Sequence, residues 1–552
     1  MESQCAEEQR RQGSSVCRGT EPLGSLARWI ARTAVVLAVL VCGSLALTDS
    51  AVAGGGGPNS LKTVPVPLPG DLGNFIRDFQ AATRLGKALF WDVQVGGDGQ
   101  VACATCHYNA GVDARTNNGT VHAGPNGVID ISLPLTRDDF PLHNDDRIGS
   151  QGVRPRTFNG LVFGSAGDNC TGPTSGPRQV TGRNTPPMID AIFHIHNFWD
   201  GRAKREFNGV TPAGQVDPRP MIWVNDPDKG LVQESVIIQP ASAASQEVGP
   251  PNNGVEMSCD LRSFPQLGRK MINNGLTPLG AQKVAADDSV LGPLSNYPAN
   301  GLNTTYKALI DAAFQPEFTS DATLPDGSGF TQKEANFSLF WGLSIMMYDS
   351  TLVANDTKFD KAREGLTTLT SQEQQGLNLF NDKARCKSCH GGPEFTSASI
   401  MNGSNGDAFV NTGVRPVADD GGVQPDIQGE FKSSHLRNIS LTGPYFHNGG
   451  YLTLKQVVNF YNRGGDFPGP FTDSNIRPLG LTSSEEDAIV AFMLTLTDNR
   501  VECEKKPFDH PSIVIPEGPS ITQVGQGGRS SSSCLKPFLL DGSSSFHFKM
   551  AP

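Results

Sequence analysis

The sequence lacks an excess of positive charge, and its N-terminal apolar run is too short to cross a membrane. The 45 Lys and Arg residues are outnumbered by 56 Asp and Glu residues, which gives a formal net charge of −11. Because binding of nucleic-acid phosphates needs a basic face, this balance argues against a nucleic-acid partner and leaves a cationic protein partner open. The run from Thr33 to Leu47 holds 15 residues, fewer than the roughly 20 that span a bilayer as a helix.

Residues 1–53 have the layout of a secretory signal peptide. Arg28 and Arg32 precede the apolar run, and small residues up to Ala53 offer a cleavage site ahead of four glycines. An uncleaved membrane anchor is the alternative, which the shortness of the run disfavours. We expect cleavage near Ala53 and a periplasmic location.

Two copies of the pattern Cys-x-x-Cys-His lie far apart in the chain, at Cys103–His107 and Cys386–His390. A structural zinc site needs four ligands, usually two such cysteine pairs brought together, and a thioredoxin-like site has no need of the histidine. A c-type haem uses the whole pattern, because both thiols form thioethers to the vinyl groups and the imidazole binds the iron. The repeat in an exported chain predicts two covalently bound haem c groups. The predicted attachment sites are Cys103, Cys106, Cys386 and Cys389, and the predicted iron ligands are His107 and His390.

Each copy follows a Gly-x-x-Leu-Phe element, at Gly86–Phe90 and at Gly376–Phe380, so the chain reads as two related modules. A Thr-x-x-Glu capping box that begins at Thr370 predicts the start of the helix that carries the second element. Another box, at Thr482, predicts a helix in which Met493 falls on the apolar stripe, so we assign Met493 to a helix core.

Removal of the signal peptide leaves eight of the 11 cysteines, four of them in the haem motifs. The other four are Cys170, Cys259, Cys503 and Cys534. Disulfides persist in an oxidising compartment, and an even number of cysteines permits three pairings, among which the sequence does not choose. Free buried thiols are the alternative.

Several stretches between about Leu85 and Asp509 together resemble the bacterial di-haem cytochrome c peroxidases and MauG, the di-haem enzyme of methylamine utilisation. They are LGKALFWD, RNTPPMIDAIFHIHNFWDGR, SQEVGPPNNGVEM, CKSCHGGPEFT and LRNISLTGPYFHNGGYLTLKQVVNFYNRGG. The resemblance implies a mainly α-helical protein with two cytochrome c-like haem domains, and the 62 Gly and 39 Pro predict long irregular connections. We expect an N-terminal, peroxidatic haem domain at 54–300, a C-terminal, electron-transfer haem domain at 301–510, and an irregular tail at 511–552.

The resemblance also implies roles for single residues. Trp199 matches the family's tryptophan between the two haems, which relays electrons. Glu256 matches the glutamate that moves protons during peroxide cleavage, and Gln246 and Pro250 keep the family's spacing of ten and six residues before it.

A third set of residues resembles the calcium site between the two haem domains of the family. Asn184, Thr442 and Pro444 fall on its matching positions. Such an oxygen-rich set suits calcium. Calcium is therefore a further expected ligand.

One departure from the family's pattern concerns the first haem. Classical peroxidases have a histidine at the position of Gly176, where it can close the sixth position of the first iron in the resting enzyme. Glycine cannot do so, and we expect this iron to react with peroxide without prior reduction. His194 and His196 lie nearby in the sequence and are interpreted as supporting or core histidines.

Another departure concerns the sixth ligand of the second haem. Classical peroxidases have methionine at the position of Tyr461, whereas MauG has tyrosine. A phenolate stabilises ferric over ferrous iron and lowers the reduction potential, and methionine does the reverse. We expect Tyr461 to bind the second iron, with ligation by Met493 or another group as the alternative.

The stretch 207–245 is inserted relative to the family and enters the chain close to the peroxide pocket in sequence.

These features predict a peroxidase-type oxidoreductase that reduces hydrogen peroxide at the first haem with electrons passed through the second. A small cytochrome c or a cupredoxin is the expected donor. One alternative is a MauG-like oxidase that modifies a protein or an organic substrate, and another is a non-catalytic electron-transfer cytochrome. The natural donor, the substrate, the role of the insertion and the oligomeric state, a homodimer included, do not follow from the sequence.

Overall fold

The computed structural model describes residues 58–116, 147–402, 408–426 and 428–537. The predicted signal peptide at 1–53 and the end of the tail at 538–552 lie outside the described residues. Within those limits, no helix combines the length and the apolar character needed to cross a membrane.

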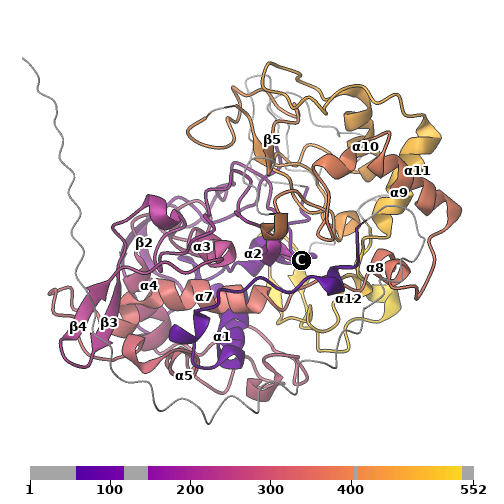
Figure 1. The fold of residues 1–552 in the computed structure, drawn as a ribbon. Helices are drawn as coiled ribbons and strands as arrows, with labels where there is room; N and C mark the ends of the chain where they lie inside the picture. Colours follow the sequence, from indigo (N-terminus) through magenta and orange to yellow (C-terminus); the bar gives the residue numbers. More distant parts are fainter. Residues whose placement is uncertain (1–57, 117–146, 403–407, 427, 538–552) are drawn as a thin grey trace, which may run out of the picture. The chain divides into compact units, whose positions relative to one another are not determined.

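Helices dominate the regular structure, and the strands of the described ranges form only two-stranded antiparallel hairpins (Figure 1). The helices are α1 Phe79–Trp91, α2 Ala104–His107, α3 Ser242–Glu247, α4 Phe264–Asn273, α5 Tyr306–Ala313, α6 Gln332–Ala335, α7 Phe337–Asp349, α8 Lys358–Arg363, α9 Ser371–Asn381, α10 Leu454–Arg463, α11 Ser483–Leu494 and α12 Asn499–Glu502. The strands are β1 Thr157–Gly160, β2 Asn169–Thr171, β3 Ile222–Asp226, β4 Gly230–Glu234, β5 Phe409–Val410, β6 Phe431–Lys432, β7 Ile513–Val514 and β8 Ser520–Ile521.

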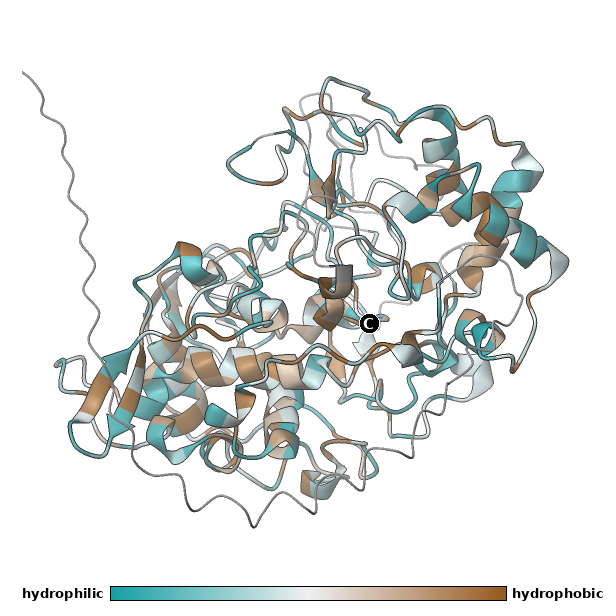
Figure 2. Cartoon of the chain, in the orientation of Figure 1, coloured by the Kyte–Doolittle hydropathy of each residue, from teal (hydrophilic) through white to brown (hydrophobic). Residues whose placement is uncertain are grey.

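The first hydrophobic core forms around α7. Every residue of α7 is buried, as expected for a helix that is apolar on all sides, and Figure 2 shows its hydrophobic colouring. Helices α1, α3 and α4 pack against α7, and α5 packs on α1. This core therefore positions α2, the short helix of the first Cys-x-x-Cys-His copy, which contacts α1.

The second hydrophobic core forms where α9 packs on α11 and α11 on α10. The predicted capping boxes at Thr370 and Thr482 are confirmed. In each, the threonine hydroxyl accepts a hydrogen bond from the backbone N–H of the glutamate three residues later. Met493 is buried on α11, as its place in the apolar stripe predicted.

The repeated Gly-x-x-Leu-Phe element marks the same kind of helix contact in both cores. A Cβ atom placed on Gly86 of α1 would lie 1.9 Å from the backbone oxygen of Ser344 on α7. A Cβ atom on Gly376 of α9 would lie 1.9 Å from the backbone oxygen of Ala488 on α11. Each glycine thus permits backbone-to-backbone contact between the helix before a haem motif and the helix that supports it.

Replacing Gly376 by alanine is expected to destabilise the protein by roughly 1–3 kcal/mol, because the added methyl group has no space against α11. Urea unfolding followed by circular dichroism measures this change. Gly469→Ala is the control, since nothing lies within 4 Å of a Cβ atom there. Equal unfolding midpoints for the two variants would contradict the close contact.

The two cores divide the chain later than the expected domain boundary at 300/301. The first core includes Tyr306, Phe337 and a continuous series of segments up to Ala354, together with a few later residues such as Leu441 and Val501, whereas the second begins at Phe359. Helices α5 and α7 carry apolar faces that are buried against α1, so packing places them with the first core. The haem-domain limits themselves stay a prediction.

Two disulfides join the four remaining cysteines, Cys170 to Cys259 and Cys503 to Cys534. The second one ties the tail to the residue that follows α12. Ile513 and Ile515 of the tail are buried in the first core, so the described part of the tail packs on that core.

Candidate haem sites and peroxide pocket

The first Cys-x-x-Cys-His copy presents its histidine in the form that iron binding requires. The Nδ1 atom of His107 lies 2.8 Å from the backbone oxygen of Gly111. Because a carbonyl oxygen only accepts, Nδ1 carries the proton and Nε2 is left as the free lone pair. Burial lowers the pKa of His107, which favours the neutral ring. Cys103 and Cys106 are free of disulfides.

The second copy has the same arrangement. Nδ1 of His390 lies 3.3 Å from the backbone oxygen of Phe395, and burial lowers the pKa of the ring to about 4. Cys386 and Cys389 are free thiols on a short 3-10 turn. In the described part of the chain no three His, Cys, Asp or Glu side chains gather around one point as a metal site would need, so the two cysteine pairs do not form a joint zinc site.

A cavity adjoins the second copy, and side chains of the second hydrophobic core line it together with residues earlier in the chain, among them Asn184 and Trp199. The wall residues that matter for function are Asn184, Trp199, Cys386, Cys389, His390, Lys432, His435, Thr442, Pro444, Tyr445, His447, Tyr461 and Met493. Both cysteines and the histidine thus face one space, together with many apolar side chains. These residues fit a covalently attached haem c.

Tyr461 and Met493, the two alternative sixth ligands, both line this cavity. Tyr461 lies in the last turn of α10, where its ring packs on Phe446 and Phe460 with centroids 6.0 and 5.0 Å apart. Burial raises the pKa of the Tyr461 phenol above its usual range, so the hydroxyl stays protonated unless a cation binds its oxygen. Because Met493 lines the same cavity, its sulfur is the alternative sixth ligand for the second iron.

Trp199 lines the cavity, and Gln246 binds the backbone beside it. The indole N–H of Trp199 donates to the backbone oxygen of Asn184 at 2.8 Å, and its ring is edge-on to His447. The side-chain oxygen of Gln246 accepts from the backbone N–H of Phe198 at 3.1 Å. Gln246 is therefore held one residue away from the tryptophan.

Glu256 lies in a turn near the first haem motif. The side-chain oxygen of Asn253 accepts from the backbone N–H of Glu256 at 3.1 Å and holds the turn, which follows a 3-10 turn begun by Pro250. Burial raises the pKa of Glu256, and the positive charge of Arg202 opposes that rise. The carboxylate is close enough to Cys106 to contribute, after burial and Asp113, to raising the pKa of that thiol to about 12.

The three predicted calcium ligands meet at the wall of the cavity. The Asn184 amide nitrogen lies 2.6 Å from the backbone oxygen of Pro444, and Thr442 lines the same cavity. Rotation of the amide by half a turn would present its oxygen instead, as a calcium ligand must. The donor set fits calcium, whose binding stays a prediction.

Several cavity residues were not found from the sequence. The buried amine of Lys432 lies 2.9 Å from Nδ1 of His194 and 3.2 Å from the side-chain oxygen of Asn197. His194 is therefore a buried histidine that supports the cavity wall, and its ring lies 5.4 Å from that of His435. The signal that could have found this cluster is the stretch FKSSH, directly before LRN.

Gly176 and the β3–β4 hairpin of the insertion lie away from these contacts, whereas Ser242, near the end of the insertion, donates to the backbone oxygen of His194 at 2.6 Å. Gly176 is exposed, and its backbone oxygen accepts from Arg154. The insertion forms the β3–β4 hairpin, and the backbone of Trp223 in β3 hydrogen-bonds Asn336, directly after α6. Figure 1 draws this hairpin well apart from α2. The described part of the insertion thus extends the first core.

Comparison with known proteins gives one family match. A sequence profile described as di-haem cytochrome c peroxidase matches residues 80–368, more than half of the chain. The match includes the first Cys-x-x-Cys-His copy and ends before the second.

Curated relatives carry peroxidase and MauG names. Cytochrome-c peroxidase IdrP2 of Denitromonas iodatirespirans is 33% identical over 193 residues, 30% of this chain and 51% of the relative. Cytochrome-c peroxidase IdrP1 of Pseudomonas sp. (strain SCT) is 23% identical over 496 residues, 84% of this chain and 93% of the relative. The chain spans about half the length of the first curated relatives it matches. A solved MauG-like protein associated with microbial copper homeostasis is 19% identical, with a TM-score of 0.46 and coverage of 82% of this chain and 97% of its own.

Proposed function

Because the chain belongs to the di-haem cytochrome c peroxidase family, we propose that it is an oxidoreductase that reduces hydrogen peroxide at its first haem site. The observation that carries this proposal is the half-buried Glu256 beside the first Cys-x-x-Cys-His copy. Burial raises the pKa of this carboxyl, which suits a group that accepts a proton and returns it.

The proposed function uses two haem sites, one at each Cys-x-x-Cys-His copy. When bound, the two haems supply redox-active iron. His107 and His390 present unprotonated Nε2 atoms as iron ligands, and the paired cysteines provide the thioether sulfurs. Tyr461 is the proposed sixth ligand at the second site.

The protein also handles the protons and electrons. Reduction of hydrogen peroxide to water consumes two electrons and two protons. Glu256 takes the proton from one peroxide oxygen and delivers it to the other, while Gln246 supports the pocket. Trp199 is the proposed relay between the sites, since its indole lines the second cavity and its neighbour Phe198 binds Gln246.

The electron donor is proposed to be a small cytochrome c or a cupredoxin in the periplasm. The two disulfides support export, because disulfides persist in oxidising compartments. Mass spectrometry of the mature N-terminus tests the proposed cleavage near Ala53.

A second candidate function is oxidation of a protein or organic substrate in the manner of MauG. Two observations favour it: Tyr461 lies at the cavity wall, and Gly176 offers no side chain to close the first iron. Fast peroxide turnover with a reduced small cytochrome would contradict this alternative.

Optical and EPR titration of the ferric protein with peroxide tests the proposed function. We expect one high-spin and one low-spin haem at rest and a spectral change on adding peroxide. Two low-spin haems, together with a spectrum that peroxide leaves unchanged, would show a passive electron carrier instead.

A further inference from the structure

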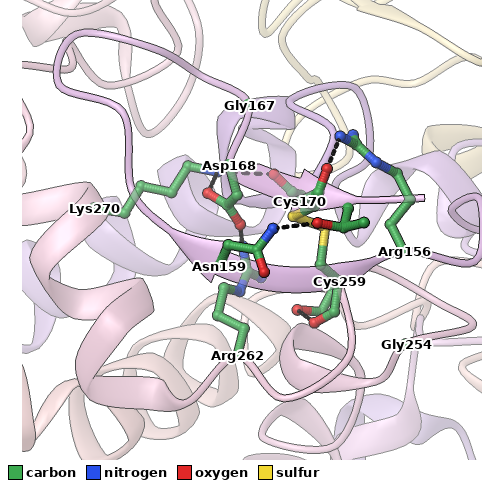
Figure 3. Close-up of a disulfide and its surroundings, with 12 residues drawn as sticks. Arg156, Asn159, Gly167, Asp168, Cys170, Gly254, Cys259, Arg262 and Lys270 are labelled. Atoms are coloured by element: carbon green, nitrogen blue, oxygen red, sulfur yellow. Dashed lines mark hydrogen bonds and ion pairs between the residues drawn. A yellow bond between two sulfur atoms is a disulfide. The ribbon is translucent and has the colours of Figure 1, made fainter. Parts of the chain in front are cut away.

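We propose that the Cys170–Cys259 disulfide is a positioning element that holds Glu256 in place for peroxide cleavage. The inference rests on the proposed function, since it assigns Glu256 the proton transfer. Cys259 follows Glu256 in the same irregular segment, and Cys170 belongs to β2, so the bond ties the glutamate turn to the β1–β2 hairpin (Figure 3).

Backbone hydrogen bonds extend this hairpin to the segment after Glu256. The N–H of Phe158 donates to the oxygen of Asp260 at 2.9 Å, and the N–H of Asp260 donates to the oxygen of Arg156 at 2.8 Å. Asp260 thereby lies alongside β1 directly after the disulfide. The chain that leaves the glutamate turn is attached to the hairpin by two hydrogen bonds and one covalent bond.

A buried ion cluster anchors the base of the same unit. Asp168, next to β2, binds Arg262 at 2.7 Å and Lys270 of α4 at 2.8 Å, and all three side chains have no exposed surface. Arg262 also donates to the backbone oxygen of Pro251, which precedes the glutamate turn. Because breaking a buried ion pair leaves an uncompensated charge, this anchor resists displacement.

The glutamate turn also contacts the backbone of two other segments. The N–H of Val153 donates to the oxygen of Val255 at 3.0 Å, and the N–H of Gly97 donates to that of Met257 at 2.7 Å. A Cβ atom on Gly152 would lie 2.0 Å from the oxygen of Val255 and 2.6 Å from that of Glu256. The turn is therefore enclosed between Gly152 and the disulfide-linked hairpin.

Such enclosure has a catalytic purpose. Glu256 lies outside any helix or strand, and irregular segments open more easily than packed elements. Proton transfer needs the carboxylate at hydrogen-bond distance from peroxide, and a misplacement of about 1 Å can cost on the order of 10²-fold in rate. A covalent bond directly after the turn limits that misplacement.

The two disulfides of the protein provide a matched experiment. In Cys170→Ser/Cys259→Ser, the bimolecular rate constant for reaction with hydrogen peroxide is expected to fall at least about tenfold, while the resting optical and EPR spectra are unchanged. In Cys503→Ser/Cys534→Ser, which releases only the tail, the rate constant is expected to stay within about twofold of wild type. Stopped-flow absorbance of the fully haem-loaded proteins measures both.

A pH profile separates positioning from loss of stability. The rate depends on ionised Glu256, so it rises with pH through the pKa of that carboxyl. The charged group that faces it is Arg202, and burial is what raises its pKa. The sulfur of Cys106 is a thioether in the haem-loaded protein and does not titrate. A released turn exposes the carboxyl and lowers its pKa. The rising limb of the pH profile, where the rate increases as Glu256 ionises, therefore moves to lower pH in the Cys170→Ser/Cys259→Ser variant. A merely less stable protein below its unfolding temperature keeps the wild-type limb.

A second variant covers the case in which the double serine variant does not load haem. Gly152→Ala displaces the same turn from its other side and is expected to lower the rate constant and shift the limb in the same direction. Gly73→Ala, where nothing lies within 4 Å of a Cβ atom, is its control. Wild-type rate and limb in Gly152→Ala, or in the double variant, overturn the inference. Failure of the wild type to react with peroxide instead overturns the proposed function.

Discussion

Replacing Glu256 by glutamine is expected to slow the reaction with hydrogen peroxide by about 10²–10⁴-fold, the range that a positioned acid–base group contributes. Glutamine has nearly the same shape and fits the same turn, but it cannot accept the peroxide proton. Stopped-flow mixing of the ferric protein with peroxide measures the rate constant. The resting spectra of both haems are expected to match those of wild type.

The pH dependence of the same reaction gives a second readout. The wild-type rate is expected to rise with pH as Glu256 loses its proton, and burial shifts this rise toward higher pH. The glutamine variant lacks the rise. Glu234→Gln, an exposed change on the β4 hairpin strand, is the control for the charge change. A Glu256→Gln variant with the wild-type rate would exclude this residue as the proton carrier.

Replacing Tyr461 by phenylalanine is expected to abolish the low-spin signal of a tyrosinate-bound haem at rest. Phenylalanine keeps the aromatic packing on Phe446 and Phe460 but removes the oxygen donor. Tyr461→Met is expected to raise the reduction potential of the second haem by roughly a few tenths of a volt, within the ~0.8 V range that axial ligands span. EPR spectroscopy and spectroelectrochemical titration measure these changes.

Tyr445 supplies the matched control for Tyr461. It lines the same cavity, but its hydroxyl donates to the backbone oxygen of Ile439 at 2.9 Å. Tyr445→Phe is therefore expected to keep the low-spin signal. If Tyr461→Phe also keeps the signal and Met493→Leu loses it, then Met493 is the sixth ligand.

Local sequence patterns predicted the local features of this protein. The capping boxes at Thr370 and Thr482 appear as expected, because their hydrogen bonds join residues within one helical turn. Free thiols at both Cys-x-x-Cys-His copies and the buried Met493 agree with their patterns as well. The family stretches placed Trp199, Tyr461 and the calcium candidates, and these side chains do share one cavity.

Features that depend on distant parts of the chain were not predictable in the same way. The four remaining cysteines permitted three pairings, and the pairing observed depends on where the β1–β2 hairpin and the tail fold. The contact between Lys432 and His194 was not predictable from local spacing, because the two residues lie on distant parts of the chain. Helix α7 belongs to the first core because packing, which no local pattern records, joins that helix to α1.

The sequence by itself determined the residues on which the proposed chemistry rests: two thiol pairs, each with an adjacent histidine, a glutamate at the family's position, and a tyrosine in place of methionine. Short spacing suffices to predict covalent haem attachment, because it uses neighbouring side chains, whereas the glutamate and the tyrosine were assigned through the resemblance to the family. The tertiary structure alone decided which cysteines pair, in which hydrophobic core each helix packs, and which segments enclose Glu256. Those outcomes depend on burial and on contacts between distant segments, whose free energies exist only once the whole chain has packed.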